Sequence, residues 1–90
     1  MVFVRDDRRR NGCFTIADTR DYAVDVYSVP YGTNEIAGNV ISIDDENAAI
    51  WLYLEADLSK LKTLRPRRAT GTPEKIYSKL LSLGFHEYRI

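Results

Sequence analysis

Several residue types are scarce in this sequence, and each scarcity excludes a class of protein. The 90 residues include one cysteine, Cys13, so no disulfide can form within the chain. With His86 as its single histidine, the chain lacks the set of ligands that a structural zinc site needs. The longest apolar run, Ala48 to Leu54, is far shorter than the ~20 residues that a membrane helix needs. We therefore expect no disulfide, no structural zinc and no membrane span.

The amino terminus and the cysteine content predict a cytoplasmic protein. Met1 is followed by no long apolar stretch behind a basic start, so we expect no signal peptide. A secreted domain of this size often needs disulfides, and none is available here. With 44% hydrophobic residues, the chain is predicted to fold as a single compact domain over residues 1–90.

No arrangement of residues indicates catalysis. The five glycines form no phosphate-binding motif, and no serine lies in a nucleophile elbow. Nothing in the spacing of Cys13 and His86 supports a thiolate pair. The run Asp44-Asp45-Glu46-Asn47 offers oxygen ligands, but it lacks the alternating acids, the glycine and the distant glutamate of a calcium loop. The sequence predicts a protein that is not an enzyme and has no metal or other cofactor.

The first part of the chain predicts an antiparallel meander. Asn11-Gly12 favours a type I′ turn between a strand at Val2–Arg10 and a strand at Cys13–Asp18. Asp18–Asp21 predicts a second turn, and the run Tyr22–Val29 then alternates as a strand does. We therefore expect three consecutive antiparallel strands.

A further hairpin is predicted around the acidic run. Strands at Ile36–Ile43 and Ala48–Glu55 would flank Asp44-Asp45-Glu46-Asn47. This register places Trp51 and Tyr53 on one face of the sheet, together with Val40. The opposite face collects the aliphatic residues Ile41, Ile43, Ile50, Leu52 and Leu54.

From Asp57 onward the pattern changes. Leucines at helical spacing predict a short helical turn after Asp57, followed by an exposed loop at Arg65–Gly71. A helix is predicted to begin at Thr72-Pro73 and to end at Gly84, before a short strand at Phe85–Ile90. The predicted fold is α+β: a meander of four to five strands, one C-terminal helix over the Ile/Leu face, and a terminal strand.

Charge is distributed unevenly along the chain, although 13 basic and 13 acidic residues give a net charge of zero. Residues 1–17 carry four arginines and two aspartates, and residues 58–90 carry eight bases against two acids. Between them, residues 18–57 hold nine acids and one base, Arg20. The centre of the chain is therefore strongly acidic, and its C-terminal part is basic.

The acidic centre supports our first hypothesis, a non-catalytic protein-binding module. Carboxylates would steer a partner with a basic surface, and aromatic side chains would anchor it. A small stoichiometric inhibitor of the immunity, antitoxin or anti-defence type would work in this way. The alternative is that these residues are only solvated or packed. The candidate contacts are Asp25, Asp44, Asp45, Glu46, Trp51 and Tyr53.

The basic clusters support an alternative hypothesis, a nucleic-acid-binding module. Their arginines could neutralise phosphates and release counterions. The candidate contacts are Arg8, Arg9, Arg10, Arg65, Arg67 and Arg68. A third hypothesis is a homodimer formed by pairing of an edge strand at Phe85–Ile90.

Overall fold

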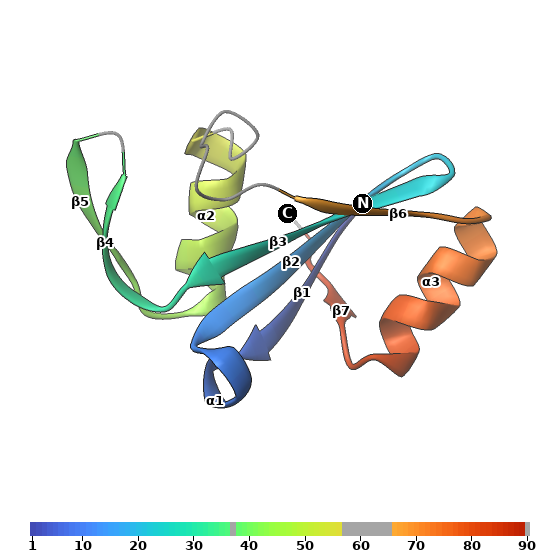
Figure 1. Ribbon diagram of the computed structural model, residues 1–90, viewed down its shortest axis with the longest axis horizontal. Coiled ribbons are helices and arrows are strands. Elements are labelled where there is room, and N and C mark those ends of the chain that lie inside the picture. The colour runs from blue at the N-terminus through green and yellow to red at the C-terminus, as the bar shows by residue number, and fades with distance from the viewer. Residues whose placement is uncertain (37, 57–65, 90) are drawn as a thin grey trace.

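A five-stranded antiparallel sheet lies at the centre of the protein (Figure 1), and the fold is α+β, as predicted. The computed structural model describes residues 1–36, 38–56 and 66–89. The strand order is β6-β3-β2-β1-β7. These strands span Arg67–Thr70 (β6), Ala23–Pro30 (β3), Cys13–Arg20 (β2), Val2–Asp7 (β1) and His86–Glu87 (β7).

The remaining elements of the described residues are a second sheet and three helices. The second sheet is the hairpin of β4 (Gly32–Ile36) and β5 (Asn39–Ile43). A single turn, α1 (Arg8–Asn11), connects β1 to β2. Helices α2 (Glu46–Ala56) and α3 (Pro73–Ser82) lie on opposite sides of the central sheet (Figure 1). None of the helices within the described ranges is long and apolar enough to cross a membrane.

The alternation of side chains along β1 and β2 gives the sheet two apolar faces. Phe3 pairs with Ala17 and Val4 pairs with Ile16, so neighbouring pairs point to opposite sides. Phe3 and Ala17 pack with Val24, Ile76, Leu80 and Phe85 under α3. The α2 side holds the larger core: Val4, Phe14, Ile16, Tyr27, Val29, Ile43, Ala49, Ile50 and Leu52.

The Asn11-Gly12 signal marks a different connection from the one predicted. Gly12 has a φ of +72°, the left-handed conformation expected of that residue, but its N–H donates to Arg8 O and so ends a helical turn. The strand Val2–Arg10 therefore stops at Asp7, where Asp7 pairs with Cys13. The two-residue hairpin turn of the sheet lies instead at Asp21-Tyr22.

The predicted strand Ala48–Glu55 is wrong, because Glu46–Ala56 forms α2. The Asp45 carboxylate accepts a hydrogen bond from Ala48 N at 2.8 Å, which begins the helix. Ala49, Ile50 and Leu52 are buried in the core, so this apolar run belongs to a helix that is covered on much of its surface. A short apolar run has no periodicity that separates a buried strand from a buried helix.

Two other boundaries also differ from the prediction. The strand expected at Ile36–Ile43 is divided, because Ile36 pairs with Asn39 across a turn that contains Gly38. The loop expected at Arg65–Gly71 contains β6, which pairs with β3. Arg65 and the helical turn predicted after Asp57 lie outside the described residues.

The predicted C-terminal helix and short terminal strand are confirmed, although the strand expected at Phe85–Ile90 is limited to His86–Glu87. The Thr72 hydroxyl accepts a hydrogen bond from Lys75 N, Pro73 opens α3, and Gly84 follows the helix with a φ of +88°. β7 then returns to the sheet and pairs with β1. The face covered by α3 is not the predicted Ile/Leu face, because Ile43, Ile50 and Leu52 belong to the α2 side.

Candidate functional site

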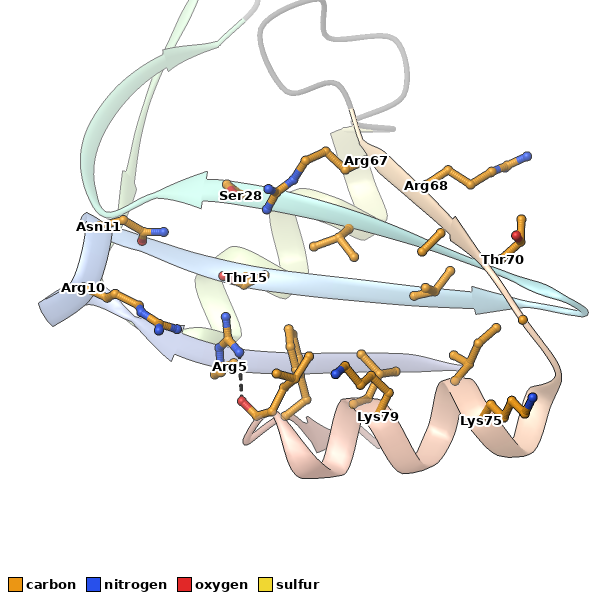
Figure 2. Close-up of a pocket in the computed structure, with 18 residues that line it drawn as sticks. Arg5, Arg10, Asn11, Thr15, Ser28, Arg67, Arg68, Thr70, Lys75 and Lys79 are labelled. Carbon is orange, nitrogen blue, oxygen red and sulfur yellow. Dashed lines mark hydrogen bonds between the residues drawn. The ribbon is translucent and has the colours of Figure 1, made fainter.

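A groove with a volume of about 710 Å³ lies between α3 and β6, over the face of the sheet opposite α2. Figure 2 shows that β6 forms one wall and α3 the other, with β2 and β3 behind them. Helix α3 leaves part of β2 and β3 open on this side, where Thr15, Val26 and Ser28 line the groove. We call this feature the basic groove.

The floor of the basic groove is aliphatic. Val24 and Val26 come from β3, and Ile76 and Leu80 come from α3. Leu83 is 46% exposed, and it carries the apolar surface to the end of α3. Such a floor favours an apolar ligand surface, because burial of both surfaces removes apolar area from water.

Basic residues surround this floor, and none of the described residues that line it is acidic. Arg67 stands on the β6 wall, Lys75 and Lys79 stand on the α3 wall, and Arg10 lies at one end (Figure 2). All four are exposed, and no side-chain hydrogen bond or ion pair to another described residue engages them. These four side chains are therefore free to meet an anionic ligand.

Arg5, in contrast, is a fixed part of the groove. Its Nε lies 2.9 Å from both carboxylate oxygens of Asp7, and its Nη1 donates to Leu83 O at 2.8 Å. Its guanidinium also lies 4.5 Å from the ring centre of Phe85. Asp7 is 6% exposed and also accepts a hydrogen bond from the Thr15 hydroxyl. Burial alone would raise the pKa of Asp7, but the bonds from Arg5 and Thr15 lower it below its ordinary value.

Arg68 is held on the other side of β6. Its Nε and Nη2 donate to the Asp25 carboxylate at 2.8 and 3.0 Å, a bidentate pair that joins β6 to β3. The hydrogen bonds from Arg68 lower the pKa of Asp25 and outweigh the effect of its burial. Arg68 therefore stabilises the edge of the sheet, although it also contributes to the groove wall.

The acidic and aromatic residues of the first hypothesis do not share one sheet surface. Asp25 is buried against Arg68. Tyr53 lies on α2, its ring packs against that of Tyr27 with the ring centres 5.2 Å apart, and it donates a hydrogen bond to Asp18. Burial and the bond to Asp18 raise the pKa of Tyr53 far above its ordinary value. Asp25 and Tyr53 are thus used inside the fold.

The other four residues of that hypothesis lie at α2. Asp44 is exposed, and Asp45 caps the helix. The Glu46 carboxylate lies 3.1 Å from His86 Nε2. Trp51 is 54% exposed on the outer side of α2 and belongs to neither core cluster. Asp44 and Trp51 are therefore the members of the set that remain available.

The basic set of the alternative hypothesis is brought together only in part. Arg10 and Arg67, which are far apart in the sequence, both line the basic groove. Arg8 is bound to Asp6 at 2.7 Å and lies over the Phe14 ring, and Arg9 is exposed outside the groove lining. Arg65 is outside the described residues.

Lys75 and Lys79 were missed by the sequence reasoning. They are one helical turn apart, so they extend from the same side of α3 toward the groove. Lysines at this spacing on an amphipathic helix usually indicate only a solvated face. The signal that could have selected them is their position beside the buried stripe of Ile76 and Leu80.

Cys13 and His86 have separate partners. The Cys13 thiol contacts Asn11 O at 3.6 Å, whereas His86 contacts Glu46. Burial and the nearby Asp7 carboxylate raise the pKa of Cys13, which disfavours its reactive thiolate. Among the described residues, no group of three or more metal-binding side chains is close enough to hold an ion.

Comparisons with protein-family models, with curated proteins and with solved structures find no match to this chain.

Proposed function

We propose that the protein is a non-catalytic protein-binding module, and that its basic groove receives an acidic, apolar segment of a partner protein. The observation that carries this proposal is the groove itself: four basic side chains surround an aliphatic floor, and none of them forms a side-chain hydrogen bond or ion pair with another described residue. Apolar side chains of the partner would cover the floor, and its carboxylates would meet the surrounding cations.

The proposal keeps the predicted class of protein but reverses the charge of the partner. The sequence hypothesis required a basic partner on an acidic sheet, and two members of that surface, Asp25 and Tyr53, are engaged internally. The charged groove residues that form no side-chain hydrogen bond or ion pair with another described residue are basic. They are Arg10, Arg67, Lys75 and Lys79. A small stoichiometric inhibitor in the cytoplasm would act in this way by occupying an acidic segment of its target.

The test is a calorimetric titration with a synthetic amphipathic peptide in which leucine and glutamate recur at helical spacing. We expect saturable binding that weakens as salt is added, because the charges around the groove are exposed. The Lys75→Glu/Lys79→Glu variant should bind at least about tenfold more weakly, or about 1.4 kcal/mol. Both lysines are exposed and form no ion pair with another described residue, so this variant should retain the fold.

Two controls make the titration specific. The same peptide with lysine in place of glutamate should not bind, because the groove would repel it. Arg89→Glu makes the same change of charge at an exposed cation outside the groove lining, and it should bind as the wild type does. Equal affinity of the wild type and the double variant would overturn the proposal.

A second candidate function is nucleic-acid binding in the same groove, favoured because Arg10 and Arg67 both line it. The aliphatic floor offers only Phe85 as an aromatic ring, and that ring lies buried beneath Arg5, so base stacking has little support here. Adding a fluorescent single-stranded oligonucleotide to the peptide complex distinguishes the two functions. Oligonucleotide binding that exceeds peptide binding at physiological salt would favour this second function.

A further inference from the structure

The outer side of α2 carries apolar side chains that neither core uses. Trp51 is 54% exposed and Leu54 is 46% exposed. Helical spacing places both on the same side as Asn47 and Glu55, which are also exposed. We call these four residues the α2 face. An exposed tryptophan beside an exposed leucine is typical of an interaction surface, where tryptophan often supplies much of the binding energy.

The charged side chains on α2 and just before it are acidic, opposite in sign to those of the basic groove. Residues 21–56 include five acids after Asp25 and contain no lysine or arginine. Asp44 and Asp45 are exposed just before α2, and Glu55 is exposed near its end. The α2 face therefore combines an aromatic anchor with carboxylates, which is the chemistry that the basic groove is proposed to bind.

The two surfaces lie on opposite sides of one sheet. Helix α2 packs on the face that contains Val4 and Ile16, and the basic groove opens on the face that contains Val24. Figure 1 shows α2 and α3 on opposite sides of the sheet. They cannot meet within one molecule, because the sheet separates them. They can meet between two molecules, one offering its α2 face and the other its basic groove.

We infer that the partner for the basic groove is the α2 face of a second copy of this chain. The inference rests on the proposed function, and it adds the identity of the partner. Trp51 of one copy covers the aliphatic floor of the next, and its acidic neighbours meet Lys75 and Lys79. Such a contact is heterologous: the pair still has one free groove and one free face, so further copies can add to form an open chain or a ring.

The experiment is sedimentation velocity at low salt over roughly two decades of protein concentration. The wild-type mass should rise with concentration, and it should fall back toward that of the monomer when salt screens the contact. The groove variant Lys75→Glu/Lys79→Glu and the face variant Trp51→Ser/Glu55→Lys should each be monomeric when alone. Circular dichroism should confirm that both variants are folded.

A mixture of the two variants gives the decisive result. The groove variant retains its α2 face, and the face variant retains its groove, so one contact can form and no further copy can be added. We therefore expect a one-to-one dimer in the mixture and monomers in each variant alone. As a control, the groove variant alone at doubled concentration should remain monomeric. Absence of the mixed dimer would overturn the inference.

Other outcomes are equally informative. Dimers that persist in both separate variants would indicate a contact elsewhere, such as edge-strand pairing at β7, and would overturn the inference. A wild type that stays monomeric but binds the acidic peptide would overturn the inference and leave the proposed function standing. A wild type that does neither would overturn both.

Discussion

At the scale of single residues, several aspartates that appear from the sequence to be surface charge are structural. Asp7 holds Arg5 and Thr15 under the groove, and Asp25 holds Arg68 at the edge of the sheet. Asp18 accepts the hydrogen bond of Tyr53 from α2. Each carboxylate thus has a partner that compensates its burial, and no buried side-chain nitrogen or oxygen in the described ranges lacks one.

The Asp25–Arg68 pair predicts a specific dependence of stability on pH. The pKa of Asp25 is lowered in the folded state, so its contribution is present above the unfolded pKa of about 3.9 and is lost as pH falls through the folded value. Arg68 is mostly exposed, so solvent screening limits the contribution of the pair to about 1 kcal/mol. Urea denaturation of Asp25→Asn should show this loss at pH 7.

The difference in the free energy of unfolding between Asp25→Asn and the wild type should shrink as pH falls below about 4, because protonation then removes the charge of the wild-type carboxylate. Glu35→Gln removes an exposed carboxylate from β4 and should change stability little at any pH. A deficit that stays constant down to the lowest pH measured would mean that the charge of Asp25 is not what stabilises the fold.

At the scale of elements, the sequence predicted correctly the helices and strands that are specified by residues within or next to the element itself. The Thr72-Pro73 start and the Gly84 end of α3 are hydrogen-bonding and φ preferences that few other conformations satisfy. The alternation of β3 was read correctly for the same reason. Strand β6 was missed, because four exposed residues rich in charge become a strand only when β3 supplies the partner.

Helix α2 shows how a continuous apolar run misleads. The alternation of Ile50 and Leu52 with Trp51 suggested a strand, and the helix cap at Asp45 was read as part of a turn. The local signal for a helix was present in Asp45 followed by Ala48 and Ala49, since aspartate caps helices and alanine favours them. This capping signal predicts a helix in place of the strand, and it places Trp51 on a helix surface.

Removal of this cap should destabilise the protein measurably. Asp45→Ala loses the hydrogen bond to Ala48 N, which should lower the free energy of unfolding by about 1 kcal/mol. In a domain of this size, that corresponds to a fall in melting temperature of about 4–8 °C. The neighbouring Asp44→Ala removes an exposed carboxylate that has no hydrogen bond or ion pair with another described residue, and it serves as the matched control in thermal denaturation. Equal melting temperatures for the two variants would contradict the cap.

At the scale of the whole molecule, a net charge of zero conceals a separation of charge across the sheet. The sequence showed an acidic centre and a basic C-terminal part, and the fold places α2 and the basic groove on opposite sides. The sequence could not show that Arg10 and Arg67 line one groove, because their common location depends on the strand order β6-β3-β2-β1. It also could not show that Asp25 and Tyr53 form hydrogen bonds within the fold, because their partners lie far away in the sequence.

This separation predicts chromatographic behaviour that the net charge does not. A protein with a pI near 6.6 and evenly mixed charges would be held weakly by any ion exchanger at pH 7. We expect this protein to be retained at low salt by both cation and anion exchangers, because each can bind one side. Lys79→Glu and Arg89→Glu lower the net charge equally, but only Lys79 lines the groove. Lys79→Glu should therefore elute from the cation exchanger at a clearly lower salt concentration than Arg89→Glu, whereas equal elution would mean that the basic residues do not act as one surface.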